Sequence, residues 1–215
     1  MIARHDIETF AANNTNMSDF DRLVHLQWAV FSVISAGIEG AFVEVGCNAG
    51  KTSAFFGHLL RHFDQSERSL HLFDSFSGLP APSVHDAYLK EGELPASPDD
   101  VLLEFARWNL PSPAIHKGWF EQTLPQSLPE KVAFCYLDAD FYLSTKHALS
   151  AIYPRMTKGG LLIVDDYADE ERNPQAWNVL GGVKRACDEV LTDKREQMMV
   201  LCATNDLAFG LLRKA

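Results

Sequence analysis

The chain has 215 residues, of which 47% are hydrophobic and 22% are charged, and this composition fits one globular domain with a full-sized core. Acidic residues outnumber lysines and arginines by 29 to 19, so the formal net charge is −10, and neither nucleic acid nor an anionic membrane is expected as a partner. With no apolar run near the roughly 18 residues of a membrane span, no secretory signal and four scattered cysteines, we expect a cytoplasmic protein.

The first 40 residues predict an arm followed by a helix. Residues 1–17 have no clear period and are rich in Asn and Thr, so we expect them to be mobile. Ser18 is a suitable N-cap, apolar residues then recur at helical spacing from Leu23 to Ile34, and Gly37 ends the pattern.

Two buried strands come next. AFVEV (41–45) is a short apolar run, and the helix that follows it carries Phe55 and Leu59 on one face. LHLFD (70–74) is the second apolar run and ends in Asp74. Such runs are typical of parallel strands, because both faces of a parallel sheet are covered.

The stretch 75–113 interrupts this alternation. Six prolines lie in it, and loops of this length are usually functional or disordered. We interpret residues 79–113 as a lid-like insertion within the single 215-residue domain, with a helix that opens at Pro98 and runs through Trp108.

Three more strands are predicted after the insertion: AIHKG (114–118), VAFCYLD (132–138) and LLIVDD (161–166). Between the last two, Ser144 and Thr145 can cap a helix that Gly159-Gly160 ends. The segment is then strand, helix and strand, which is a right-handed crossover in a parallel sheet.

Four aspartates lie at the ends of the last two of these strands: Asp138, Asp140, Asp165 and Asp166. Parallel strands deliver such residues to one edge of the sheet, and ligands bind at that edge in open α/β sheets. Four carboxylates repel one another unless protons or a cation intervene. Because Mg²⁺ takes oxygen ligands, we favour a metal site over ordinary solvent-facing strand ends.

The remaining chain predicts a helix over 181–193 and a hairpin of two strands, 198–204 and 207–213. The hairpin would add an antiparallel edge, which is common in otherwise parallel sheets. The fold class is therefore α/β, with a mostly parallel seven-stranded sheet, an antiparallel C-terminal hairpin and helices on both faces.

The glycine turn in VEVGCNAGKTS has three interpretations. A P-loop fails by one position, because only three residues separate Gly46 from Gly50, and Asn48 breaks the dinucleotide fingerprint. The third pattern is Glu-x-Gly-x-x-x-Gly after a strand. There the glycines allow a tight turn and close approach of a ligand, and Glu44 can accept hydrogen bonds from a cationic amine.

This last pattern resembles the first motif of class I methyltransferases, which have a Rossmann-like fold. The segments HLFDSFSGLP, GWFEQTLP, YLDADFYLST and GGLLIVDDY resemble the macrocin O-methyltransferase family, over roughly Ala41 to Val190. The most specific part is YLDAD together with IVDDY. The chain departs from the family in a shorter N-terminus and in its own 80–113 segment.

The resemblance implies a role for each site residue, with S-adenosylmethionine and Mg²⁺ as cofactors. The cofactor-binding residues would be Glu44, Gly46, Asn48, Gly50, Thr52, Asp74, Trp119, Phe120 and Asp138. Asp74 would hold the ribose, and Trp119 and Phe120 would border the adenine, although both could equally be core aromatics. The metal ligands would be Asp138, Asp165 and Asp166, leaving Asp140 as the general base, with Asp138 beside it at the catalytic centre.

The leading hypothesis is a metal-dependent O-methyltransferase that acts on a small hydroxylated acceptor, a sugar or polyol unit of a natural product. A DxD-type nucleotide-sugar glycosyltransferase is an alternative, but it gives no role to the glycine turn or to Asp74. A catechol-type O-methyltransferase is another; its lysine base would stand where this chain has Phe141. His85 is the next candidate base after Asp140, and the resemblance and the N-terminal arm suggest a homodimer.

Overall fold

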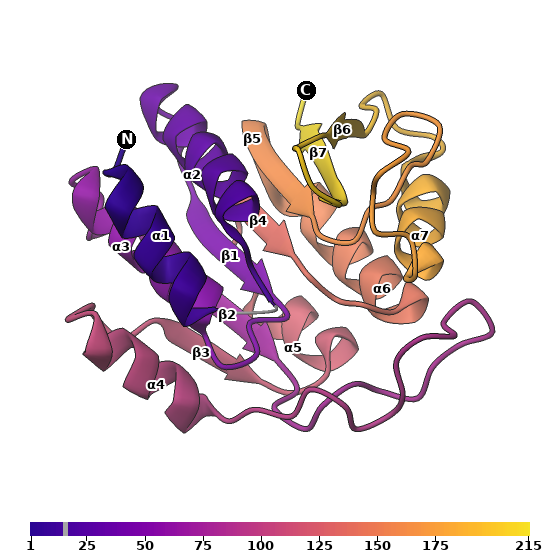
Figure 1. Ribbon diagram of the computed structural model, residues 1–215, viewed down its shortest axis with the longest axis horizontal. Coiled ribbons are helices and arrows are strands. Elements are labelled where there is room, and N and C mark those ends of the chain that lie inside the picture. Colours follow the sequence, from indigo (N-terminus) through magenta and orange to yellow (C-terminus); the bar gives the residue numbers. More distant parts are fainter. Residues whose placement is uncertain (15–16) are drawn as a thin grey trace.

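The computed structural model describes residues 1–14 and 17–215 and shows one sheet with helices packed on both faces (Figure 1). The strands are β1 (Ala41–Val45), β2 (Leu70–Asp74), β3 (Ala114–Lys117), β4 (Val132–Leu137), β5 (Met156–Val164), β6 (Met199–Leu201) and β7 (Phe209–Arg213). The helices are α1 (Arg4–Asn13), α2 (Phe20–Ser35), α3 (Lys51–His62), α4 (Pro98–Arg107), α5 (Phe120–Ser127), α6 (Tyr142–Ile152) and α7 (Gly181–Leu191).

The seven strands lie in the order β3-β2-β1-β4-β5-β7-β6. β1 to β5 are parallel, and β7 pairs antiparallel with both β5 and β6. This confirms the predicted fold class, including the C-terminal hairpin. The order also reverses direction between β1 and β4, and ligands of such sheets bind at the carboxyl side of this point.

Alternate residues of the central strands build two apolar layers. Phe42 and Phe134 belong to the layer under α2 and α3, where Tyr136 also lies. Val43 and Cys135 point the other way, into the layer under α6 and α7. Because β1 and β4 are buried on both faces, their sequences are apolar apart from Glu44 and do not alternate between apolar and polar residues.

The N-terminal residues are not a mobile arm, and that prediction was wrong for residues 4–13. They form α1, whose Ile7 and Phe10 are buried, and the Phe10 ring stacks on Trp108 with 3.9 Å between the centroids. Residues 15–16 lie outside the described residues. The cap of α2 also differs by one position: Asp19, not Ser18, accepts the Arg22 backbone N–H at 2.8 Å.

The helix after β4 begins and ends earlier than predicted. α6 starts at Tyr142, so Ser144 and Thr145 lie inside it, and the Thr145 N–H donates to the Phe141 carbonyl at 2.9 Å. A 3₁₀ turn at Tyr153–Arg155 follows Ile152, because Pro154 cannot continue the helical hydrogen bonds. Gly159-Gly160 lie within β5 and do not end the helix.

The segment between β2 and α4, residues 75–97, contains no helix or strand. Figure 1 shows it as a long loop that passes beyond the carboxyl ends of the strands toward α6 and α7. α4 then starts at Pro98 with a capping box formed by Ser97 and Asp100, which confirms the predicted helix. Among the described residues, no helix combines the length and apolar character needed to cross a bilayer.

Candidate active site

The turn after β1 touches the turn after β4. Gly46 has φ +89°, and a Cβ atom built on it would lie 1.7 Å from the Asp138 carbonyl oxygen. Any side chain at this position would therefore have to displace the backbone of Asp138, just after β4. Gly46, predicted to allow a tight turn after the strand, also allows close approach of the backbone that follows β4.

Asp74 ties the turns after β1 and β2 together. Its carboxylate accepts the Asn48 N–H at 2.8 Å and the Phe76 N–H at 2.7 Å. Burial raises the pKa of Asp74, and the two backbone hydrogen bonds oppose that rise. Asn48 itself has φ +46°, a conformation that asparagine tolerates better than most residues.

Glu44 lies beneath the glycine turn rather than in a cavity. Its side chain is 1% exposed and accepts a hydrogen bond from the Ser53 hydroxyl of α3. Burial raises the pKa of Glu44 to about 8. Thr52 and Gly50 also face protein: Thr52 accepts a bond from Asn14, and Gly50 packs on Val101 of α4.

A cavity opens above the turns after β1 and β2 and is bounded by α5 and α6. Of the predicted cofactor residues, it is lined by Gly46, Asn48, Asp74, Trp119, Phe120 and Asp138. Trp119 and Phe120 are half-buried at its wall, which differs from fully buried core aromatics. Glu44, Gly50 and Thr52 do not line it.

Three carboxylates converge next to this cavity. One oxygen each from Asp138, Asp140 and Asp166 lies within 4.8 Å of the others. Asp140 and Asp166 occupy turns with φ +54° and +58°, so each side chain follows its strand at a sharp bend. Carboxylate oxygens at this spacing, half-buried at Asp138 and Asp140 and buried at Asp166, fit a hard divalent cation, which would relieve their mutual repulsion.

The electrostatics of the cluster follow from burial and like charge. Burial, followed by repulsion from Asp165, raises the pKa of Asp138 and of Asp166. The same two causes raise the pKa of Asp140 to about 7, with a smaller contribution from Asp74. A cation bound among them would reverse these shifts.

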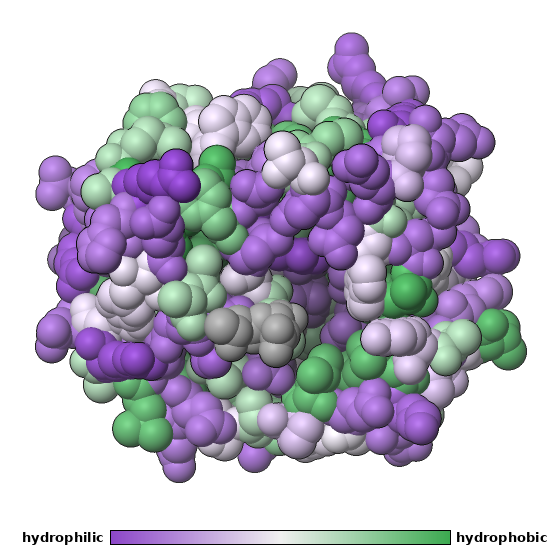
Figure 2. Space-filling view, viewed as in Figure 1, coloured by the Kyte–Doolittle hydropathy of each residue, from purple (hydrophilic) through white to green (hydrophobic). Residues whose placement is uncertain are grey.

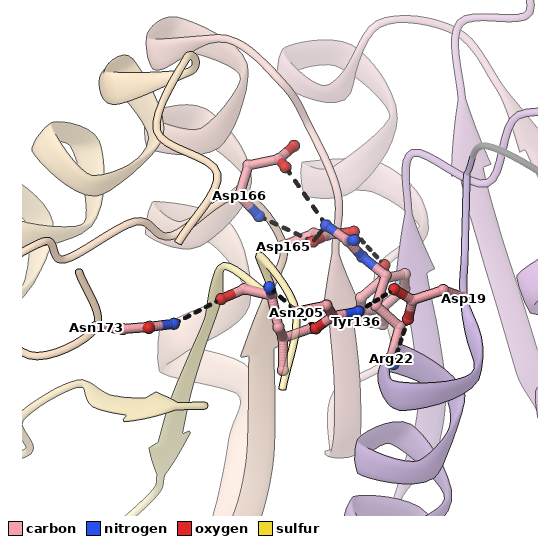
Figure 3. Close-up of polar contacts among 8 residues, drawn as sticks. Asp19, Arg22, Tyr136, Asp165, Asp166, Asn173 and Asn205 are labelled. Atoms are coloured by element: carbon pink, nitrogen blue, oxygen red, sulfur yellow. Dashed lines mark hydrogen bonds and ion pairs between the residues drawn. The ribbon is translucent and has the colours of Figure 1, made fainter. Parts of the chain in front are cut away.

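Asp165 points to Arg22 and Tyr136 (Figure 3). One oxygen of Asp165 accepts hydrogen bonds from the Arg22 guanidinium at 3.1 Å and from the Asp166 backbone N–H at 2.9 Å. The other oxygen accepts a hydrogen bond from the Tyr136 hydroxyl at 2.5 Å. The sequence grouped Asp165 with Asp138 and Asp166 as a ligand and left Asp140 out. The geometry brings Asp140 in and gives both Asp165 oxygens protein partners.

A second cavity of about 700 Å³ adjoins the first. It lies between the start of α2, the 75–97 segment and the loop after β5, and Figure 2 shows this face hollowed near its middle, with hydrophilic residues there. Asp138 and Asp140 line both cavities. A molecule bound in the first cavity and a molecule bound in the second would therefore both lie next to these two carboxylates.

The histidines are distributed differently from the expectation. His85 packs its ring on Tyr142 with centroids 4.7 Å apart, and it lines neither cavity. His147 does line the first cavity, together with Leu143 and Ser144 of α6. These three were not predicted as site residues; the available signal was that Leu143 and Ser144 precede His147 by four and three positions in the helix after YLDAD, a spacing that places each next to His147.

The sequence matches a known family. The model of the macrocin-O-methyltransferases (TylF) matches residues 3–189. The chain belongs to this family. The match confirms the resemblance and extends it over α1 and α2, which lie before the region from which the resemblance was drawn.

Two curated O-methyltransferases are similar over most of the chain. One is the 8-demethyl-8-(2,3-dimethoxy-α-L-rhamnosyl)-tetracenomycin-C 4'-O-methyltransferase of Streptomyces olivaceus, 34% identical over 71% of this chain and 62% of that protein. The other is the mycinamicin III 3''-O-methyltransferase of Micromonospora griseorubida, 30% identical over 77% of this chain and 70% of that protein. The match thus spans less than two thirds of the first relative.

A solved structure with the same fold is that of the O-methyltransferase NovP. It superposes with a TM-score of 0.77 at 25% identity, covering 92% of this chain and 81% of NovP. The superposition shows that the fold of NovP extends over most of this chain.

Proposed function

We propose that this chain is an S-adenosylmethionine-dependent O-methyltransferase that methylates a sugar hydroxyl of a glycosylated small molecule with the help of a divalent cation. The observation that carries the proposal is the meeting of two cavities at Asp138 and Asp140. Methyl transfer is an in-line displacement, so donor and acceptor must occupy adjoining sites and face each other across a short gap.

The first cavity suits the methyl donor. Asp74 can accept hydrogen bonds from ribose hydroxyls on the lone pairs that Asn48 and Phe76 leave free. Trp119 and Phe120 offer the faces on which an adenine ring can lie. We assign Glu44 a supporting role, holding α3 through Ser53, in place of a direct contact with the cofactor.

The acidic cluster suits a divalent cation held by Asp138 and Asp166. Mg²⁺ commonly takes one or two carboxylates and completes its shell with water and substrate oxygens. Such a cation would lower the pKa of an acceptor hydroxyl and orient it. Asp140, at the junction of the cavities, is then the residue that accepts the proton from that hydroxyl.

The second cavity suits an uncharged glycoside. Among the described residues that line this cavity, Arg22 is the one cation, and six are aspartates. A nucleotide diphosphate would meet repulsion there. Tyr88 and Trp177, with ring centroids 5.6 Å apart, join the 75–97 segment to the loop after β5 at this cavity, and aromatic faces pack well on sugar rings.

A matched pair of acceptors tests the proposal. Product mass is measured with 4-nitrophenyl α-L-rhamnoside and with TDP-L-rhamnose, each with S-adenosylmethionine and Mg²⁺, and each again in EDTA. We expect a mass gain of one methyl group on the neutral glycoside and loss of that product in EDTA. Preference for the nucleotide sugar would refute the neutral acceptor, and full turnover after exhaustive chelation would refute the cation.

A further inference from the structure

The 75–97 segment, which passes toward α6 and α7 in Figure 1, is attached to α6 by the carboxylate of Asp86. One oxygen of Asp86 accepts the backbone N–H of Tyr142, the first residue of α6, at 2.8 Å. Asp86 is 9% exposed, and the first N–H groups of a helix have no partner within the helix. At the N-cap, the Phe141 side chain makes no capping hydrogen bond among the described residues. Asp86 therefore caps α6 from a position 56 residues away, and its charge is favourable at a helix N-terminus.

The second oxygen of Asp86 closes a turn within its own segment. It accepts hydrogen bonds from the Ser83 backbone N–H at 2.9 Å and from the Ser83 hydroxyl at 2.6 Å. The Asp86 N–H donates in return to the Ser83 carbonyl at 3.1 Å. His85, within this turn, packs its ring on Tyr142. Both carboxylate oxygens thus have protein partners, and residues 83–86 form a compact turn against the start of α6.

The first turn of α7 leaves the space that Asp86 occupies. A Cβ atom built on Gly182 would lie 2.5 Å from the Asp86 oxygen that caps α6, and 3.0 Å from the Cβ atom of Tyr142. An alanine at this position would therefore have to displace its neighbours. A Cβ atom built on the adjacent Gly181 would meet no atom of the described residues within 4 Å. Gly182 is thus the position at which α7 admits the carboxylate to the end of α6.

Both of the turns that Asp86 joins lie at the proposed reaction site. The turn that precedes α6 contains Asp140, which lines both cavities. Two residues after Asp86, Tyr88 lines the second cavity, and its ring centroid lies 5.6 Å from that of Trp177. A shift of Asp86 relative to α6 would therefore move one wall of the second cavity relative to Asp140.

We propose that Asp86 is a positioning residue: by capping α6 it holds Asp140 and the Tyr88 wall of the second cavity in one fixed arrangement. Asp86 lines neither cavity and acts through the two turns that it joins. Methyl transfer requires the reacting oxygen to lie in line with the methyl group, so a small displacement of these turns lowers the rate. The effect on the reaction rests on the proposed function, whereas the cap itself does not.

Hydrogen exchange of the full chain, followed by mass spectrometry of its peptides, tests the cap without any substrate. In Asp86→Ala, peptides covering 83–90 and 138–145 should exchange about tenfold faster or more, because the Tyr142 N–H loses a bond to a charged group. At exchange times of minutes, β1 and β5 should stay protected. Glu91→Ala removes an exposed charge from the same segment and is the matched control. Unchanged exchange of 138–145 in Asp86→Ala, or an equal rise in every peptide, would overturn the proposal.

Gly182→Ala disturbs the cap without changing Asp86. The added methyl group displaces the carboxylate, so exchange of 138–145 should rise, although alanine favours a helix more than glycine does. Gly181→Ala is the matched control and should behave like the wild type. In Asp86→Ala/Gly182→Ala the methyl group meets no carboxylate, so exchange should equal that of Asp86→Ala, and additive effects would contradict the proposal. If Asp86→Ala does not fold, the comparison of Gly182→Ala with Gly181→Ala decides.

Kinetics with 4-nitrophenyl α-L-rhamnoside measure the effect on the reaction. For Asp86→Ala and Gly182→Ala, kcat/KM for the glycoside should fall about tenfold or more, while S-adenosylmethionine affinity in calorimetry stays within about threefold of the wild type. Asp86→Asn keeps an oxygen for the Tyr142 N–H, so its kcat/KM should return to within about threefold of the wild type.

The two measurements separate this proposal from the proposed function. Faster exchange of 138–145 with unchanged kcat/KM would make the cap a contribution to stability alone and would overturn the positioning role, while the proposed function stands. If the wild type does not methylate the glycoside, the proposed function fails. Exchange of 83–90 and 138–145 then decides by itself whether Asp86 holds the two turns together.

Discussion

Glu44→Gln should make the stability of the protein less dependent on pH. The Glu44 carboxyl is fully buried on β1, and its pKa rises from an ordinary 4.5 to about 8 because burial disfavours the charged form. A raised pKa means that the folded state binds the proton more tightly than the unfolded state. The resulting stabilisation is complete below pH 4.5 and is lost as the pH rises through about 8.

The size of the effect follows from linkage. Each pH unit between the two pKa values changes the free energy of unfolding by about 1.4 kcal/mol, so between pH 5 and pH 8 the wild type should lose on the order of 3 kcal/mol through Glu44. Glutamine has nearly the same shape and does not titrate. The difference in stability between Glu44→Gln and the wild type should therefore shift in favour of the variant by that amount over this range.

Urea denaturation of both proteins at pH 5, 6, 7 and 8 measures this difference. Glu67→Gln, at an exposed position, is the matched control, and its difference from the wild type should stay constant. A constant difference for Glu44→Gln as well would show that Glu44 is ionised in the folded state at pH 5. The argument that burial dominates at this position would then be refuted.

Three further predictions concern the site. Asp74→Ala should weaken S-adenosylmethionine binding by about 1.5–3 kcal/mol in calorimetry, since it removes hydrogen bonds to a charged group; unchanged affinity would remove Asp74 from the cofactor site. Asp140→Asn should lower kcat by about 10²–10⁴-fold while Mg²⁺ and cofactor affinities stay nearly the same, and a large loss of Mg²⁺ affinity would make Asp140 a ligand. Limited proteolysis should cut loops 79–98 and 167–180 first, with protection when cofactor, metal and acceptor are all present; cleavage indifferent to ligands would count against closure.

The strands and the acidic edge could be predicted because each depends on a short local pattern. Continuous apolar runs identified β1, β4 and β5, and parallel pairing then required their polar ends to meet. The family match favours the methyltransferase over the glycosyltransferase that a DxD motif alone also allowed. Asp140 lies just beyond the end of β4, on a turn where its φ is +54°.

The features that could not be predicted depend on contacts between distant residues. The sequence of α1 has a weak apolar pattern, and the helix is held by the stacking of Phe10 on Trp108. Trp108 is 98 positions away, in the segment that was predicted to be a lid-like insertion. The orientation of Asp165 is set by Arg22, which is separated from it by 143 positions. No spacing rule within one strand distinguishes Asp165 from Asp166, and the assignment of both as metal ligands stays a prediction.

The docking of α1 has a practical consequence for work on shortened forms of this protein. Phe10 covers the Trp108 ring, and Glu104 of α4 accepts hydrogen bonds from Asn13 at 2.6 Å and from the Trp108 indole at 2.7 Å. A chain that began at α2 would expose one face of this indole to solvent. It would also lose Ala11, which lines the second cavity. The intrinsic fluorescence of Trp108 should therefore report whether α1 is packed against α4.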